Sequence, residues 1–244
     1  MSNEKTGVFW AGLALAIGLV LASAIFSWGF VKSKNKDQTI TVTGSARKRI
    51  KSDLVIWTAG VSYQSAVLSD AYRALSESVP KVKAYMIGKG IPENQITISS
   101  ISSQTLHARN NQGEETGQIT GYSLKQELEV RSNEVDKIAK IAREATELIN
   151  QGILLESMPP QYLYTKLSDL KIEMLTAAAK DAKERATKIA ESTGSSIGSV
   201  RSAKMGVLQI TPADSNEVSG EGMNDTTSLE KDITGVVNVS FAVD

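Results

Sequence analysis

The sequence predicts an α+β protein with mainly antiparallel sheets, preceded by one transmembrane helix. The first observation is a largely apolar segment at residues 8–31 that contains no charged residue. The second is a set of stretches in which apolar and polar residues alternate, as in strands that expose one face to water. The third is a set of stretches with apolar residues every three or four positions, as in amphipathic helices. These stretches follow the order ββαββ and then αβαββ, which predicts two loosely similar halves.

Residues 8–31 are long enough to cross a bilayer, whose hydrocarbon core of roughly 30 Å requires about 20 apolar residues in a helix. Aromatic residues near both ends of the segment suit the two membrane interfaces. We therefore predict a short N-terminal tail at residues 1–7, a signal anchor at residues 8–31 and a polar linker at residues 32–38. A buried helix of a soluble core is a weaker alternative, because such helices rarely need so long an apolar run.

A cleaved signal peptide is the stronger alternative, because Ala22-Ser23-Ala24 has the small-x-small form of a cleavage site. Cleavage after Ala24 would leave an apolar new N-terminus that contains Ile25, Phe26, Trp28, Phe30 and Val31. Such a terminus is unfavourable in a soluble product, so we favour an uncleaved anchor. Small residues at Ala14, Gly18 and Ala22 share one helix face and would let two helices pack closely in lipid, although such residues are common in membrane helices.

The charge balance and the missing residue types exclude several classes of function. The chain has 27 basic and 27 acidic residues, so it lacks the basic character typical of proteins that bind nucleic acid. It has no cysteine, which excludes disulfides, thiol catalysis and thiolate metal sites. His107 is the only histidine, which excludes a site built from several histidines of one chain.

The predicted domain spans residues 39–244, and its first half places one helix among strands. We expect a strand at 39–44, a strand at 54–64, a helix over 68–86 ended by Gly88 and Gly90, a strand from 96 to about 106, a polar turn at 110–117 and a strand over 122–130. Ser69 or Asp70 would cap the helix, and Pro80 would kink it near Val79 or mark a late helix boundary.

The end of the first strand carries two further signals. Gly44 ends the clean alternation of the strand and can mark a bulge. The basic run from Arg47 to Lys51 is expected in a solvated strand end or turn, and its closeness to the membrane segment leaves a contact with lipid headgroups as the alternative.

The second half of the domain is expected to contain two helices and four extended segments. The first is a helix over 135–149, capped by Ser132 or Asn133 and ended by Gly152, and extended structure follows at 153–155 and 161–167 around Pro159-Pro160. A helix then runs from Ser168 or Asp169 to about Thr193, with Gly194 after it. The domain closes with a strand at 197–210, an acidic loop at 211–232 and a strand at 237–243. Alanines recur every four residues from Ala178 to Ala190, so the longest helix can pack closely on a sheet.

Several of these segments together resemble the SIMPL-domain family, which includes the YggE-like bacterial proteins. The similarity covers about Thr39 to Val243 and rests on Ile40-Thr41-Val42-Thr43-Gly44, on Ile119-Thr120-Gly121-Tyr122, and on Asp181-Ala182, Ala186, Ala190, Gly194 and Gly198. A subgroup with an N-terminal anchor is similar in Gln151-Gly152-Ile153 and in Pro160-Gln161-Tyr162-Leu163 with Thr165, Leu167, Asp169 and Met174. Pro80 departs from the family pattern. The resemblance implies an extracytoplasmic α+β domain, large homo-oligomers and a link to stress defence, and it implies no catalytic residues.

A search for catalytic and metal-binding patterns gives no site. The glycine pairs at 88–90 and 220–222 lack the third glycine of a nucleotide-binding loop, and the acids Asp214, Glu217, Glu221 and Asp225 lack the spacing of a calcium loop. Glu127 and Glu129 could have the separation of a glycosidase pair, but glutamates on the wet face of a strand are common. We expect Asp181 to pair with Arg185 or with the amide of a turn, and His107 to have no catalytic role. We therefore predict no catalytic, cofactor-binding or metal-binding residues.

The function that we expect is structural. We predict a single-pass protein of the inner membrane whose soluble domain lies in the periplasm and forms a homo-oligomeric ring or cage, with a possible role in the envelope or in stress defence. Its partners would be other copies of itself and the bilayer at residues 8–31, without nucleic acid, and the sequence identifies no small-molecule ligand. The positive-inside rule opposes this orientation, because Lys32, Lys34 and Lys36 outnumber Lys5. The alternatives are a module that binds a solute or envelope polymer, and an envelope hydrolase that uses carboxylates.

Overall fold

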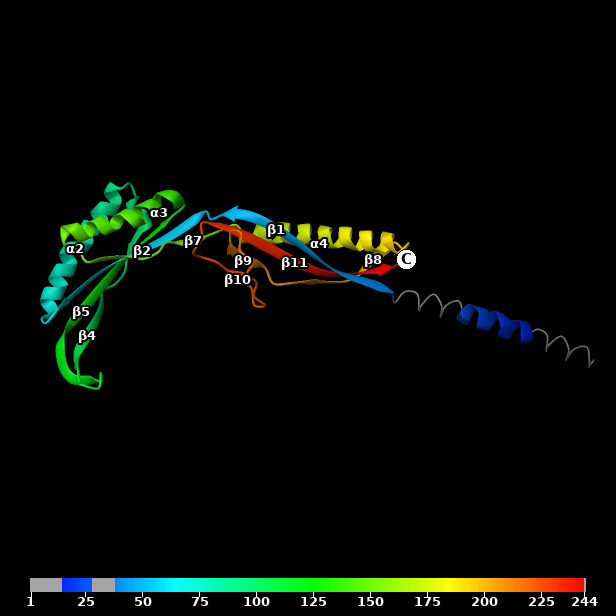
Figure 1. Ribbon diagram of the computed structural model, residues 1–244, viewed down its shortest axis with the longest axis horizontal. Coiled ribbons are helices and arrows are strands. Elements are labelled where there is room, and N and C mark those ends of the chain that lie inside the picture. The colour runs from blue at the N-terminus through cyan, green and yellow to red at the C-terminus, as the bar shows by residue number, and fades with distance from the viewer. Residues whose placement is uncertain (1–14, 28–37, 244) are drawn as a thin grey trace, which may run out of the picture. The chain divides into compact units, whose positions relative to one another are not determined.

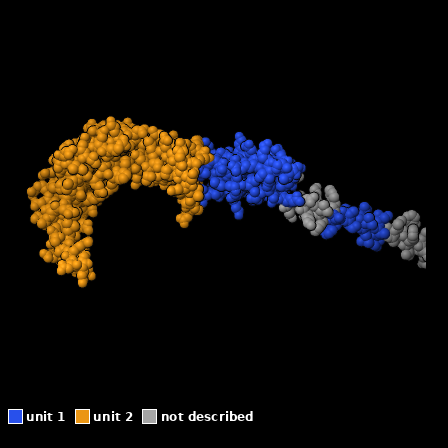
Figure 2. Space-filling model, viewed as in Figure 1, with its two compact units in different colours: residues 1–46, 171–207, 234–244 blue, residues 47–170, 208–233 orange. Residues whose placement is uncertain are grey.

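The computed structural model describes residues 15–27 and 38–243, which form two compact units (Figure 2). Unit 1 contains the described residues of Met1–Ala46, Lys171–Val207 and Thr234–Asp244, and unit 2 contains Arg47–Leu170 and Leu208–Ile233. The prediction of an α+β protein with mainly antiparallel sheets is confirmed (Figure 1). Each unit combines segments that are far apart in the sequence, so the units are not the two successive halves that the order of elements suggested.

Residues 15–27 are helical and their side chains are exposed. Within the described ranges, no helix is long and apolar enough to cross a membrane. The anchor predicted at residues 8–31 extends beyond the described residues at both ends, and the predicted tail at residues 1–7 lies entirely outside them. The linker at residues 32–38 lies outside them except for Gln38, and so does Ala14 of the small-residue stripe. These assignments therefore stay predictions.

Unit 2 is built on a six-stranded sheet in which every pairing is antiparallel. The long strands β2 (Leu54–Ser65) and β5 (Glu115–Ser132) pair in one continuous register from Val55 opposite Ser132 to Ser65 opposite Tyr122. Strands β6 (Leu155–Ser157) and β7 (Gln161–Leu163) extend the sheet beside β2, while β3 (Ile96–Ile98) and β4 (Ser102–Arg109) extend it beside β5. The strands predicted from alternation at 54–64 and 122–130 are therefore confirmed.

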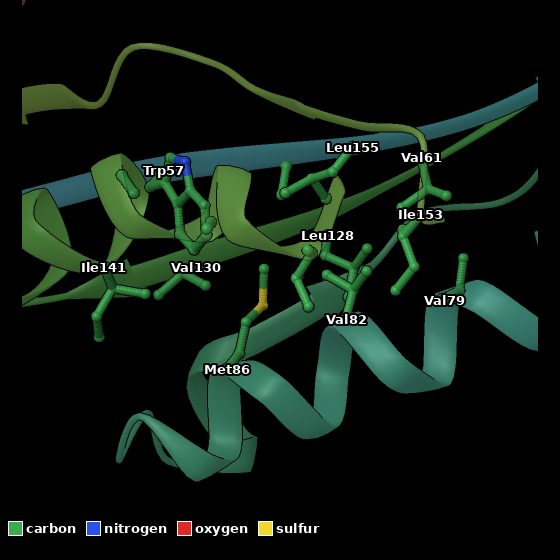
Figure 3. Close-up of a cluster of buried hydrophobic side chains, with 14 of the residues drawn as sticks. Trp57, Val61, Val79, Val82, Met86, Leu128, Val130, Ile141, Ile153 and Leu155 are labelled. Carbon is green, nitrogen blue, oxygen red and sulfur yellow. The ribbon is translucent and has the colours of Figure 1, made fainter. Parts of the chain in front are cut away.

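Helices α2 (Leu68–Gly88) and α3 (Val135–Glu144) bury one face of this sheet. The alternate residues Val55, Trp57, Ala59 and Val61 of β2 are inaccessible to water. In Figure 3, Val82 and Met86 of α2 lie against Leu128 and Val130 of β5. Each large apolar side chain buried in this way contributes about 1.5–3 kcal/mol to folding. The indole N–H of Trp57 donates to Ser157 Oγ at 3.0 Å, which in turn donates to the carbonyl of Ala142 at 2.7 Å.

The helices of unit 2 differ from the prediction at their ends. Helix α2 begins after Val67 with no side-chain cap, so the caps expected from Ser69 or Asp70 are wrong. Pro80 lies within α2 and marks no helix boundary, because the ring is on the exposed face while Val79 and Val82 are buried in the core. Burial of those neighbours outweighs the hydrogen bond that proline cannot donate.

Helix α3 is shorter than the stretch predicted at 135–149. It passes into a 3-10 helix at Ala145–Gln151, which ends at Gly152 with φ +79° as expected. Its N-cap residue is Glu134, which makes no capping hydrogen bond through its side chain. The cap predicted at Ser132 or Asn133 is therefore wrong, although the Ser132 hydroxyl accepts a bond from the Glu134 amide at 3.2 Å.

Unit 1 packs one helix on a small sheet formed by parts of β1 (Thr39–Lys51) and β11 (Glu230–Val243) together with β8 (Ile197–Met205). Strand β11 lies between the other two strands and pairs with β8 in antiparallel register. The helix is α4 (Leu167–Ser192). Among the described residues, the core between this helix and the sheet contains a single large aromatic ring, that of Phe241. The buried residues of this core are Val42, Ala178, Ala182, Ala186, Val237, Val239 and Phe241. The alanine repeat of the sequence is thus confirmed as the sheet-facing side of the helix.

Several predicted strand boundaries are wrong. Strand β1 continues through Gly44 to Lys51, so the basic run is part of a strand. The strand predicted from 96 to 106 is divided into β3 and β4, and the one at 197–210 is divided into β8 and β9 (Gln209–Pro212). The loop predicted at 211–232 contains β10 (Met223–Asn224), which is parallel to β9, and the start of β11. In each case pairing with a distant strand decides where the extended structure begins and ends.

Candidate functional site

A buried carboxylate organises the charged residues of β1 and β11 in unit 2. The side chain of Asp232 is 3% exposed and receives Arg47 Nη2 at 2.6 Å and Arg49 Nε at 3.0 Å. The backbone N–H of Asp214 donates to it at 2.9 Å. Arg47 and Arg49 point to the same side because they are two residues apart on a strand. The Arg49 guanidinium, together with the Asp214 amide and Arg47, holds the pKa of Asp232 well below its usual range although burial acts to raise it.

The neighbouring Lys231 is also buried, with 2% of its side chain exposed. Its ammonium donates to the carbonyl oxygens of Tyr162, at 2.8 Å, and of Asp225, and it lies 3.8 Å from the Asp225 carboxylate. Burial lowers the pKa of Lys231, against the opposing effect of Asp225. Burial acts to raise the pKa of Asp225, but hydrogen bonds from Thr227 and Ser228 outweigh it and lower that pKa.

These charged groups bind one another instead of presenting a reactive atom. The two carboxylates accept hydrogen bonds from arginines, hydroxyls or amides, and the lysine donates to carbonyls. The arrangement fastens residues 213–229 to β1 and β11. We predicted a solvated strand end for Arg47 and Arg49 and a solvated loop for Asp214 and Asp225. Both predictions are therefore wrong in part. Asp214 does remain exposed where it meets Arg49.

The structure does not gather the other candidate residues of the sequence into a site. Glu127 on β5 pairs with Lys125 at 3.1 Å, and Lys125 also reaches Glu156 at 3.3 Å. His107 lies on β4 opposite Ile119, with its Nδ1 buried and unbonded. Among the described residues, no group of three or more histidine or acidic side chains could hold a metal ion.

A groove of about 620 Å³ lies in unit 1 between β1 and α4. Its lining combines Val42 and Thr43 of β1 with residues of α4, namely Asp181, Glu184, Arg185, Lys188 and Ile189. Asp181 accepts hydrogen bonds from the Ser45 backbone N–H at 2.8 Å and from Arg185 Nε at 2.8 Å. These two donors, the Ser45 amide first, lower the pKa of Asp181. The predicted pairing of Asp181 with Arg185 is confirmed, whereas the amide that Asp181 also binds belongs to strand β1 and not to a turn.

The two outer strands of the unit 1 sheet each have one open edge in the described part of the chain. Strand β1 ends the sheet on one side, and β8 pairs only with β11 on the other. Residues 199–205 of β8 are all exposed, including Val200 at 56% and Met205 at 68%. An exposed strand edge offers unpaired N–H and C=O groups to another chain. The sequence reading missed this feature of β8, although the polar Ser202 and Lys204 on one face of the strand are an available signal.

Comparison with known proteins places these features in a family. The profile of SIMPL, described as a protein of unknown function (DUF541), matches residues 40–241. The 26 kDa periplasmic immunogenic protein of Brucella melitensis is 30% identical over 149 residues, which cover 57% of this chain and 59% of that protein. The protein of the same name from Brucella abortus is similar to the same extent. The chain therefore spans about three fifths of the length of the curated relatives that it matches.

Solved structures are only remotely similar. A hydantoinase/carbamoylase family amidase from Burkholderia ambifaria aligns with a TM-score of 0.27 and 9% identity, over 52% of this chain and 34% of that chain. A TM-score this low does not indicate a shared fold.

Proposed function

Since the chain belongs to the SIMPL family, we propose that it is a membrane-anchored, extracytoplasmic structural protein that assembles into a homo-oligomeric ring or cage. The proposed anchor is residues 8–31 and the proposed assembling part is the domain at residues 39–244. The periplasmic name of the Brucella relatives supports an extracytoplasmic domain. The proposal assigns the protein no catalytic residue and no cofactor.

The observation that carries the proposal is the pair of open edges on the unit 1 sheet. Natural proteins usually protect an edge strand with a proline, a bulge or a covering segment, because an open edge recruits other chains. The pairing of β8 with β11 is irregular opposite Phe241, but residues 199–205 of β8 are all exposed, and its apolar Val200 and Met205 face water. The chain has no net charge, so copies do not repel one another at long range. An anchor in the membrane would also raise the effective concentration of copies in one plane.

The mass of the full chain in detergent tests the assembly. We expect size-exclusion chromatography with light scattering to give one discrete mass that is a multiple of the 26.2 kDa chain. Closed symmetric assemblies are the usual outcome for homo-oligomers, so the distribution should be narrow. A monodisperse monomer would refute the structural function and favour a solute-binding module.

A labelling experiment tests the side of the membrane on which the domain lies. The chain has no cysteine, so a single Gln112→Cys variant carries one reactive thiol. Gln112 is exposed in the turn between β4 and β5, whereas the Asn110 side chain holds that turn by accepting hydrogen bonds from the Gln112 and Glu114 amides. Substituting Gln112 therefore leaves the turn intact. A membrane-impermeant maleimide should label cells whose inner membrane is intact, after the outer membrane is permeabilised if one is present. Labelling only after the inner membrane is broken would place the domain in the cytoplasm.

A further inference from the structure

The open edges of β1 and β8 in unit 1 are complementary, and they identify a contact between copies in the proposed assembly. We infer that strand β1 of one copy pairs in parallel with strand β8 of the next copy. The inference rests on the proposed homo-oligomer and specifies the surfaces that meet in it.

The backbone of β1 shows which of its groups are open. The Val243 N–H donates to the Gln38 carbonyl at 3.1 Å, so even-numbered residues of β1 point their N–H and C=O groups toward β11. Odd-numbered residues, among them Thr41 and Thr43, point away from it. The Ser45 N–H confirms this direction, because it reaches Asp181 of α4 and not β11.

The same reasoning identifies the open groups of β8. The Gly206 N–H donates to the Val236 carbonyl at 2.8 Å, and Lys204 and Ser202 continue this register opposite Asn238 and Ser240. Even-numbered residues therefore face β11, and Ala203 and Met205 point their backbone groups outward. Each edge thus presents outward donors and acceptors that a neighbouring strand can satisfy, apart from the Ser45 N–H that Asp181 already binds.

The strand directions decide how copies would join. The contacts Thr41–Ser240 at 2.8 Å and Thr43–Asn238 at 2.5 Å show that β1 and β11 are antiparallel. Strand β8 is also antiparallel to β11, so β1 and β8 run in the same direction. When a second copy lies beside β1 with its sheet in the same orientation as the first, its β8 therefore lies parallel to β1. This contact joins two different surfaces, and such a contact generates a ring where the repeated rotation closes.

The side chains also fit this pairing. Met205 and Val200 of β8 lie opposite Val237 and Phe241, so they are on the α4 side of the sheet. They lie at its uncovered edge and are exposed. The groove beside β1 opens on the same side and is lined by Val42 and Ile189. Parallel pairing would move the apolar row of one copy toward the groove of the next and remove it from water.

Pairing of like edges fits less well. Two β8 strands would bring the Lys204 side chains of two copies to one edge, and like charges on facing strands are destabilising. Two β1 strands would place two grooves side by side and leave Val200 and Met205 exposed. The pairing of β1 with β8 uses both edges in every copy and leaves neither open.

Crosslinking between two single-cysteine variants tests the inference. Thr41 contacts Ser240 and Ser202 lies opposite Ser240, so both residues are on the face of the sheet away from α4. Neighbouring strands lie about 4.8 Å apart, within reach of a short bismaleimide. We expect a crosslinked dimer when full-length Thr41→Cys and Ser202→Cys chains are co-expressed, and no dimer from either variant alone. Because each chain has one thiol, any crosslink joins two copies.

The other outcomes of this experiment separate the inference from the proposed function. Dimers from Ser202→Cys alone would show that β8 pairs with β8 and would overturn the inference. Absence of dimers in a co-expressed sample whose mass is still that of an oligomer would also overturn it, while the structural function would stand. A monomeric mass for the unmodified chain would overturn both.

A matched pair of substitutions on β8 provides an independent test. Ala203→Pro removes an outward N–H and leaves the bonds of Ser202 and Lys204 to β11, because proline is tolerated at an open edge. We expect it to raise the concentration at which the full-length assembly dissociates by about tenfold or more. A change of this size is expected from the loss of one hydrogen bond together with the steric bulk of the proline side chain. Ala203→Val keeps the N–H and should assemble normally. Equal assembly of the two folded variants, as judged by circular dichroism, would refute the pairing.

Discussion

Replacement of Gly44 by alanine should destabilise unit 1 strongly, because α4 lies directly on this glycine. A Cβ at Gly44 would be 2.2 Å from the Ala178 carbonyl oxygen, 2.4 Å from the Ala182 nitrogen and 2.6 Å from the Ala182 Cβ. Ordinary contacts begin at about 3.4 Å, so the helix would have to retreat by more than 1 Å. The first two atoms belong to the helix backbone and cannot turn aside as a flexible side chain can.

The expected cost of Gly44→Ala follows from this overlap. Extra methyl groups in well-packed regions cost about 1–3 kcal/mol, and contact with a helix backbone places this case near the upper value. For a protein of this size, about 3 kcal/mol lowers Tm by about 6–12 °C. Thermal unfolding followed by circular dichroism at fixed protein concentration measures the change.

Gly88→Ala is the matched control for this experiment. Gly88 is the last residue of α2 and has open space where a Cβ would lie. Alanine there should leave Tm unchanged or raise it slightly, because it restricts the unfolded chain by about 0.4–1 kcal/mol. If Gly44→Ala melts within about 2 °C of the parent protein, α4 does not pack on β1 as closely as described, and the account of unit 1 is wrong.

Three further substitutions test the account of the charged and buried residues. Asp232→Asn should lower the free energy of unfolding by about 2 kcal/mol at neutral pH, because it weakens a buried carboxylate's bonds to two half-exposed arginines. Because the pKa of Asp232 is lowered in the folded protein, the difference in unfolding free energy between the two proteins should have its full value above about pH 4 and shrink as the pH falls below that value. Urea titrations at several pH values measure this difference. A constant difference down to about pH 2 would contradict the ion-pair assignment. Lys231→Met should cost about 2–4 kcal/mol in the same assay, because it leaves the buried carbonyls of Tyr162 and Asp225 without their donor, and a change below about 0.5 kcal/mol would count against that contact. His107→Gln should change stability by less than about 0.5 kcal/mol, and a loss of about a hundredfold in any activity of the protein would overturn the non-catalytic role of His107.

The sequence predicted those elements whose pattern is local. Alternation identified β2 and the buried half of β5 because each has one face on the core, and four-residue spacing of alanines identified the buried side of α4. Gly152 and Gly194 were recognisable because a left-handed residue commonly ends a helix, and both have positive φ. The pairing of Asp181 with Arg185 could be predicted because Arg185 is one helical turn away.

Features that depend on distant partners could not be predicted in this way. Arg47 and Arg49 are far from Asp232 in the sequence, and nothing in their local pattern distinguishes an ion pair from a solvated strand end. The break of the 197–210 stretch into β8 and β9 depends on how each piece pairs with β11. The position of Pro80 within α2 depends on which side of the helix faces the core. The apolar stripe indicated a helix that continues past Pro80, but we gave more weight to the tendency of proline to interrupt helices.

The central claim is that the domain itself drives assembly, and sedimentation velocity of a fragment starting at Lys36 tests it most directly. Lipid gives the proposed membrane helices no hydrophobic reason to associate, so contacts between domains should dominate. At micromolar concentration we expect one sharp boundary at a mass several times that of the fragment, with Gly18→Leu in the full-length protein changing stability only modestly. A fragment that sediments as a monomer at that concentration would contradict the claim and assign the assembly to residues 8–31.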